Sequence, residues 1–237
     1  MSTFLTASWE NLIFANYKID RKPFEKFLPK HTEFDTYDGY DYASIVGFLF
    51  KNVKIKSIKY PFHHTFEEIN LRFYVRHKVG NEWRRGVVFV KEIVPKHIIS
   101  FIANTLYDEN YDTMPTKHHW KQYDNQQHIQ YEWKHKKNWN QLSVLTERQG
   151  FPTDIGSEEE FITEHYWGYA QNKRKQTTEY QVNHPKWNIY KVVEYKLSCD
   201  LTALYGNEIA NGMEKTPSSV FLADGSGVSI MNGRRIE

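Results

Sequence analysis

Four polar side chains of different chemistry occupy alternate positions in one short stretch of the sequence. The run FEEINLRFYVR, residues 66 to 76, places a carboxylate, an amide, a guanidinium and a phenol at Glu68, Asn70, Arg72 and Tyr74. Successive side chains of a β-strand point to opposite faces of the sheet, so these four share one face. Such a row offers hydrogen-bond donors and acceptors to a small anion, and Arg72 can hold a carboxylate through two parallel hydrogen bonds.

The polar row allows three functions, because the alternation does not show which face of the strand meets water. In the first, Asn70, Arg72 and Tyr74 bind a compact carboxylate or carbonyl compound in a pocket. In the second, Glu68 is the acid or base of a lyase or hydratase, provided that burial raises its pKa, and Lys91 is an electrophile or imine former. In the third, the row is a solvated face of a noncatalytic interaction protein.

The strand that pairs with the polar row is set by a hairpin turn. The pair Gly80-Asn81 separates two alternating runs and fits a tight turn, so the numbers of opposite residues sum to 161. This register adds two residues to the candidate site. Phe89 lies opposite Arg72 as a binding residue, and Lys91 lies opposite Asn70 as a catalytic one.

The opposite face of the same hairpin is apolar apart from two carboxylates at its open end. Ile69, Leu71, Phe73 and Val75 form the apolar row. Glu67 and Glu92 are predicted on this face too. The sequence leaves open whether these two acids are buried, in which case they need partners or raised pKa values.

The composition predicts a folded protein rich in β-structure. The chain has 237 residues, of which 40% are hydrophobic and 16% aromatic, far from the aromatic-poor composition of disordered chains. Short alternating runs of aromatic and β-branched residues favour strands. A helix is also expected from Pro95, where apolar residues recur at helical spacing. We therefore expect a single α+β domain over residues 1–237, mostly antiparallel β with a few short helices.

Charge and cysteine content exclude several classes of partner. The 31 basic and 29 acidic residues leave a net charge of +2, so no global field attracts nucleic acid or membrane. The basic, aromatic stretch KHHWKQYDNQQHIQYEWKHKKNW is better explained as half-buried strands. A single cysteine, Cys199, suits a reducing compartment, and no apolar run approaches the ~20 residues that span a bilayer. We expect a soluble, cytoplasmic protein whose partner is a small molecule; a homo-oligomer remains open.

The sequence predicts no metal site and no cofactor. The sequence has two histidine doublets, His63-His64 and His118-His119. Adjacent residues of a strand point to opposite faces, so the two histidines of a doublet in a strand cannot bind the same metal ion. No serine lies in a Gly-x-Ser-x-Gly elbow, and we expect the short GSG of residues 225 to 227 to form a turn rather than a phosphate loop.

Several stretches resemble the YqjF-like proteins, an uncharacterised bacterial family. They are FEEINLRFYVR, EWRRGVVFVKEIVP, LYDENY, ALYG and SVFLADGS, spread over nearly the whole chain. The family motif Glu-x-Asn-x-Arg-x-Tyr falls on the four residues of the polar row. The resemblance implies a fold similar to acetoacetate decarboxylase, a β-barrel-like double sheet around a central pocket, with the polar row turned inward.

The resemblance to acetoacetate decarboxylase also implies a Schiff-base lysine, but the sequence departs from the pattern at that position. The comparable segment is LYDENYDTMPTKHHW, in which Thr116 follows the proline and Lys117 comes one residue later. A shift of one residue turns a strand side chain to the opposite face. Lys117 is therefore a weaker candidate for an imine-forming amine than Lys91.

Overall fold

The strands form one large, mostly antiparallel sheet. The computed structural model describes residues 2–56, 58–59, 65–95 and 110–236. The strands are β1 (Thr3–Ile19), β2 (Thr32–Phe34), β3 (Asp41–Ile55), β4 (Ile58–Lys59), β5 (Phe66–Val79), β6 (Glu82–Val94), β7 (Tyr111–Thr113), β8 (Thr116–Gln122), β9 (Gln126–His135), β10 (Asn138–Pro152), β11 (Trp167–Gln171), β12 (Thr177–Asn183), β13 (Asn188–Ser198), β14 (Ser219–Met231) and β15 (Arg234–Ile236). The short helical elements are η1 (Glu25–Phe27), α2 (Glu158–Thr163), α3 (Leu201–Tyr205) and α4 (Asn207–Gly212).

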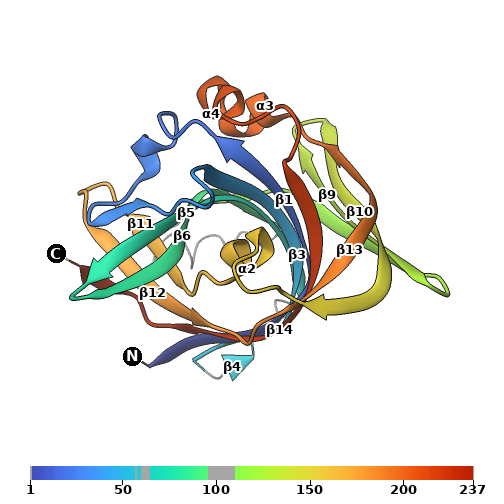
Figure 1. The fold of residues 1–237 in the computed structure, drawn as a ribbon, viewed down its shortest axis with the longest axis horizontal. Helices are drawn as coiled ribbons and strands as arrows, with labels where there is room; N and C mark the ends of the chain where they lie inside the picture. The colour runs from blue at the N-terminus through green and yellow to red at the C-terminus, as the bar shows by residue number, and fades with distance from the viewer. Residues whose placement is uncertain (1, 57, 60–64, 96–109, 237) are drawn as a thin grey trace.

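Part of the sheet closes into a ring of strands. Its path runs through β12, β11, β6, β5, β3, β1 and β14, and a pairing between β12 and β14 joins the two ends. Figure 1 looks into this ring, with α2 drawn inside it. From β14 the sheet continues through β13, β10, β9 and β8, which lie outside the ring. The ring strands therefore have an inner and an outer face, and protein covers both.

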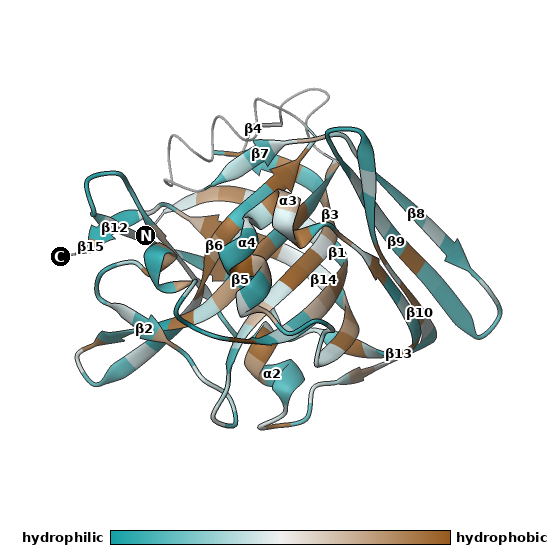
Figure 2. Ribbon diagram, turned by 90° about the horizontal axis from the view of Figure 1, so that it is seen from above, coloured by the Kyte–Doolittle hydropathy of each residue, from teal (hydrophilic) through white to brown (hydrophobic). Residues whose placement is uncertain are grey.

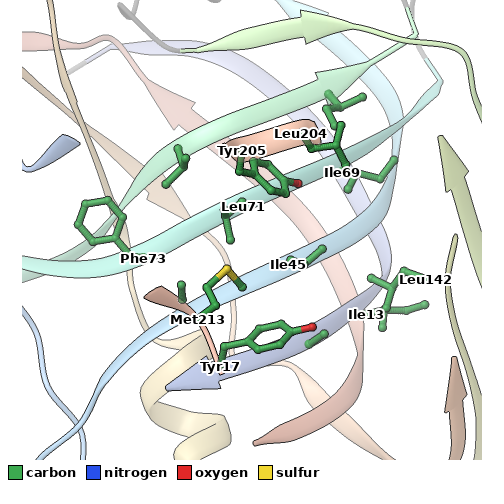
Figure 3. Close-up of a cluster of buried hydrophobic side chains, with 14 of the residues drawn as sticks. Ile13, Tyr17, Ile45, Ile69, Leu71, Phe73, Leu142, Leu204, Tyr205 and Met213 are labelled. Atoms are coloured by element: carbon green, nitrogen blue, oxygen red, sulfur yellow. The ribbon is translucent and has the colours of Figure 1, made fainter. Parts of the chain in front are cut away.

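The outer face of the ring packs against the strands and helices outside it. Figure 3 shows this apolar core, in which Ile69, Leu71 and Phe73 of β5 lie among side chains of β1, β3, β10 and the α3–α4 region. All three side chains are fully buried. In Figure 2 the ring strands carry most of the hydrophobic bands, whereas β8 is largely hydrophilic. Burial of this apolar surface is the main stabilising contribution to the fold.

A second apolar core fills much of the ring interior. It contains Phe14, Val46 and Phe48 from the strands, and Phe161 and Ile162 from α2. The sequence Ser157–Glu160 starts α2, because the Ser157 hydroxyl accepts a 3.1 Å hydrogen bond from the Glu160 backbone amide. The helix thus brings two apolar side chains into the ring beside the space described below.

The hairpin register is confirmed over most of its length but shifts near the open end. Gly80 adopts a φ of 60°, which the turn requires. Partners sum to 161 from Val79 back to Arg72, which pairs with Phe89. Beyond that point Val90 is an extra residue, so Leu71 pairs with Lys91 and every later side chain of β6 changes face. This β-bulge decides which residues of β6 face the ring interior.

Other predictions from the sequence have mixed outcomes. The mostly antiparallel α+β fold with short helices is confirmed. The basic, aromatic stretch forms strands as expected, with Ile129, Tyr131 and Trp133 buried. The helix predicted from Pro95 lies outside the described residues. Within the described ranges, no helix has the length and apolar character needed to cross a membrane.

Candidate functional site

A cavity lies inside the ring, between the strands and α2. It encloses about 650 Å³ of space not occupied by atoms, its opening to solvent included. The space that the centre of a water molecule can reach is about 70 Å³, several times the ~10–15 Å³ that one buried water needs. Large apolar side chains make up much of the wall, among them Trp9, Phe48, Phe50, Phe89, Trp167 and Trp187. The dimensions suit a compact molecule.

The polar row of β5 faces this cavity rather than water. Glu68, Asn70 and Arg72 line the wall, and Phe89 of β6 joins them opposite Arg72. Tyr74 is not on the lining. It is buried beside the cavity, where its hydroxyl shares a 2.6 Å hydrogen bond with a buried serine. The structure thus brings four of the six predicted site residues to one surface and places Tyr74 next to it.

Glu68 is a buried carboxyl group with two hydrogen-bond donors. The Asn70 amide donates to Oε1 at 3.0 Å, and the Tyr111 hydroxyl donates to Oε2 at 3.1 Å. Burial raises the pKa of Glu68 to about 7, although these bonds and the charge of Arg72 favour the ionised form. Glu68 therefore changes protonation state near neutral pH, as an acid–base group needs to do.

Arg72 lies on the cavity wall without a carboxylate partner. Its guanidinium carbon is 5.0 Å from the centre of the Phe14 ring and 6.0 Å from that of Tyr74. Within the described part of the chain, no ion pair joins Arg72 to an acidic side chain, and its buried Nε has no hydrogen-bond partner. The Oδ1 atom of Asn70 is likewise buried and unpartnered. A buried polar atom without a partner costs ~1–3 kcal/mol, so a ligand or water is expected to satisfy these atoms.

The structure does not bring Lys91 to the cavity, contrary to the register predicted from the sequence. Because of the bulge at Val90, Lys91 pairs with Leu71 on the outer side of the strand. Its ammonium group makes a 2.8 Å ion pair with Asp112. Glu92 takes the position opposite Asn70, is buried and lines the cavity. The bulge thus replaces an amine in the wall by a carboxyl group.

Glu67 and Glu92, predicted on one face, lie on different faces and are both largely buried. Glu67 is on the outer side of the ring, where Thr116 Oγ1 and His118 Nδ1 each lie 2.6 Å from its carboxylate. Burial alone would raise the pKa of Glu67, but these two hydrogen bonds lower it below its ordinary range. Glu92 shares a hydrogen bond with the Tyr111 hydroxyl, which lies between Glu92 and Glu68.

Two histidines of the wall were not singled out in the sequence. His165 is buried, and its Nε2 lies 3.0 Å from Oδ2 of Asp35. His184 stacks on Trp187 with ring centres 4.1 Å apart. Burial lowers the pKa of each histidine to about 4, so both are neutral at physiological pH. No local pattern marks His165, since Asp35, which it contacts, is distant in sequence.

The described part of the wall offers no candidate for an imine-forming amine. None of the described residues that line the cavity is a lysine. Lys117, the sequence neighbour of the expected Schiff-base position, makes a 3.1 Å ion pair with Glu132 on the outer strands. Among the described residues, no cluster of His, Cys, Asp and Glu side chains could hold a metal ion.

Comparison with protein families shows which family includes the chain. Residues 6–227 match the profile of DUF2071, described as an uncharacterized conserved protein (COG2071). The chain belongs to this family. The uncharacterized protein YqjF of Bacillus subtilis (strain 168) is 31% identical over 72 residues, which cover 30% of each chain. The match therefore spans less than a third of that relative, and it confirms the resemblance to YqjF-like proteins.

Solved structures similar to this DUF2071 protein have the acetoacetate decarboxylase fold. The acetoacetate decarboxylase of Legionella pneumophila has 11% identity and a TM-score of 0.67, with 100% of this chain and 90% of that chain covered. An acetoacetate decarboxylase-like enzyme from Sphingomonas wittichii RW1 has 12% identity and a TM-score of 0.68, with 100% and 94% covered. The enduracididine biosynthesis enzyme MppR, complexed with pyruvate, has 10% identity and a TM-score of 0.68, with 100% and 91% covered. The predicted fold is confirmed.

Proposed function

We propose that the cavity of this DUF2071 protein binds a compact carboxylate or carbonyl compound, with Arg72 as the partner of the carboxylate. The observation that carries the proposal is the guanidinium of Arg72, which has no carboxylate partner among the described residues and lies on the wall of a cavity large enough for a small acid. A carboxylate bound there would accept a charge-assisted hydrogen bond from the guanidinium. MppR, which shares the fold, is described as complexed with pyruvate, an acid of suitable size.

The neighbouring carboxyl group of Glu68 makes this binding dependent on pH. An ionised Glu68 would repel a bound anion, whereas the protonated form is neutral and can donate a hydrogen bond. Because the pKa of Glu68 is raised to about 7, the protonated form dominates below neutral pH. We expect anionic ligands to bind more tightly at pH 6 than at pH 8.

The same raised pKa supports a second candidate function, an acid–base reaction next to a carbonyl group. Glu68 would donate or accept the proton, as in a lyase or hydratase. The position of Lys91 outside the cavity gives no support to an imine route. Treatment with borohydride in the presence of acetoacetate is expected to leave the mass of the protein unchanged, and a tagged lysine would restore the imine route.

Thermal unfolding with a panel of small acids tests the binding proposal. The proteins are wild type, Arg72→Met and Arg76→Met. Arg76 is the matched control because it pairs with Glu33 and is not part of the cavity wall. A ligand at a hundredfold its dissociation constant adds ~2.7 kcal/mol of stability, which raises the midpoint by several degrees.

The proposal requires a specific pattern of shifts in the unfolding midpoint among the three proteins. At least one acid should stabilise wild type and Arg76→Met equally, with the shift lost in Arg72→Met. If no acid raises the midpoint of wild type, the cavity is not a site for compact acids. If an acid stabilises Arg72→Met as much as wild type, Arg72 is not the carboxylate partner.

A further inference from the structure

His165 is held at the cavity wall by a buried carboxylate that also binds an arginine. Oδ2 of Asp35 lies 3.0 Å from Nε2 of His165 and 2.7 Å from Nε of Arg85. The side chains of His165 and Asp35 are 1% and 7% exposed. The His165 ring also contacts the rings of Tyr74, with centres 4.8 Å apart, and Phe161, with centres 5.0 Å apart. These contacts fix the orientation of the imidazole.

The hydrogen bond to Asp35 determines which nitrogen of His165 carries the proton. Burial alone would raise the pKa of Asp35, but the hydrogen bonds from His165 and Arg85 lower it, so Asp35 is ionised and can only accept. Nε2 of His165 is therefore the protonated nitrogen. Burial lowers the pKa of His165 to about 4, against the effect of Asp35, which leaves Nδ1 without a proton.

Nδ1 of His165 is a buried acceptor without a partner in the described part of the chain. His165 lines the cavity, whereas Asp35 does not. Nδ1 is thus the nitrogen that Asp35 leaves available on a side chain that lines the cavity. Arg72 approaches the same Tyr74 ring that His165 contacts. A molecule paired with Arg72 is therefore close to an acceptor that needs a donor.

We infer that His165 accepts a hydrogen bond from the ligand through Nδ1, so that the site selects a short hydroxy acid over the corresponding keto acid or plain carboxylate. The inference rests on the proposed function and names its ligand class. The oxygen of a keto acid and Nδ1 both accept hydrogen bonds and would repel each other. The methylene group of a plain carboxylate would leave Nδ1 without a hydrogen bond. An ammonium group would be repelled by Arg72, so a hydroxyl is the donor that fits. A site built to bond a hydroxyl discriminates strongly against analogues that lack one.

Two series of acids with equal carbon skeletons test the selection. They are lactate, pyruvate and propionate, and 3-hydroxybutyrate, acetoacetate and butyrate. Dissociation constants are measured by calorimetry for wild type, His165→Phe and Arg72→Met. In at least one series the hydroxy acid is expected to bind wild type ten times more tightly than both analogues. In His165→Phe that ratio should fall to less than threefold.

A nitrogen NMR spectrum of histidine-labelled wild type, recorded without ligand, checks the inference on the unaltered protein. The signals of His165, assigned by their loss in His165→Phe or by through-bond correlation, should show a protonated Nε2 and an unprotonated Nδ1 at pH 7. A doubly protonated ring, or a proton on Nδ1, would overturn the inference.

The outcomes separate this inference from the proposed function. If acids bind through Arg72 but the keto acid binds as tightly as the hydroxy acid in both series, the role of His165 is wrong and the proposed function stands. The same holds if His165→Phe weakens all three acids of a series equally. If no acid binds wild type, both proposals fall.

Discussion

The two faces of β5 are both covered by protein, yet the pKa values of two neighbouring carboxyl groups, one on each face, are shifted in opposite directions. Glu67 points outward to Thr116 and His118, which supply hydrogen bonds that lower its pKa. Glu68 points into the cavity, where burial raises its pKa despite two donors. The outer face is a satisfied, packed surface. The inner face carries a titratable acid and an arginine that has no carboxylate partner among the described residues, both at the cavity wall.

Along this one strand, the residues that stabilise the fold lie on the outer face and the candidate site residues lie on the inner face. Outer residues such as Leu71 and Phe73 are fully buried among apolar neighbours, which is what a stable core requires. On the inner face, the buried atoms Asn70 Oδ1 and Arg72 Nε have no hydrogen-bond partner in the described part of the chain. Such atoms reduce stability unless a ligand or water satisfies them. Polar groups placed at such a cost are typical of binding sites. The following variants test the contrast, starting with the largest effect.

Phe73→Ala should be the most destabilising change, because it opens a cavity in the outer core. Phe73 is fully buried, with its ring centre 5.6 Å from that of Phe24 and 5.3 Å from that of Phe34. Burial of this kind makes a Phe-to-Ala change cost ~3–5 kcal/mol. Chemical denaturation should show this loss, while the exposed control Phe151→Ala should stay within ~0.5 kcal/mol of wild type. A loss below ~1 kcal/mol for Phe73→Ala would contradict the outer core.

Glu68→Gln should stabilise the protein at high pH and have little effect at low pH. The folded state holds the proton of Glu68 up to a pKa of about 7, whereas the unfolded chain loses it near its ordinary pKa of 4.5. Wild-type stability from this group is therefore present below ~4.5 and falls as pH rises toward 7. Glutamine carries no charge, so the gain at pH 8 should be ~2–3 kcal/mol and near zero at pH 4.

The measurement for Glu68→Gln is urea unfolding of both proteins at several pH values. If the difference between them does not change with pH, Glu68 does not titrate with a raised pKa. A destabilising effect at pH 8 would mean that the ionised carboxylate is favourable in the cavity, which contradicts its burial without a close ion pair.

Glu67→Gln should have the opposite sign. The hydrogen bonds from Thr116 and His118 lower the pKa of Glu67, so its contribution to stability is present above the ordinary value of 4.5 and is lost as pH falls below it. Loss of hydrogen bonds to a charged group at this largely buried site should cost ~1–2 kcal/mol at pH 7. The same urea series, run to pH 3, should show the difference disappear in acid. A gain at pH 7 would remove the contrast between the two faces.

Local sequence patterns predicted the two rows of β5, but they did not predict the bulge in β6 that decides which of its residues face the cavity. The alternation of residues 66 to 76 and the turn at Gly80 were sufficient for the two rows and their pairing as far as Arg72. The bulge at Val90 had no signature, because a run of valines and a phenylalanine fits a regular strand as well as a bulged one. It moved Lys91 out of the cavity and Glu92 into it.

The acceptor at His165 could not be predicted from one sequence for a different reason. His165 and Asp35 are separated by 130 residues, and they meet only because β11 and β2 both flank the hairpin of β5 and β6. Neither residue belongs to a motif with a chemical meaning. Residues that act together across a sheet are recognisable only when the strand order is known.

Lys91→Met should have the smallest effect, and it tests the consequence of the bulge directly. The ion pair of Lys91 with Asp112 is partly exposed, with side-chain exposures of 22% and 46%, and such pairs contribute ~0–1 kcal/mol. Because Lys91 is on the outer side of the strand, any acid that stabilises wild type should raise the midpoint of Lys91→Met by the same amount. If the shift were lost in Lys91→Met as in Arg72→Met, the amine would lie in the cavity and the unbulged register would be correct. Equal shifts would place the division between the two faces of β6 at Val90, with Glu92 as the group that faces the ligand.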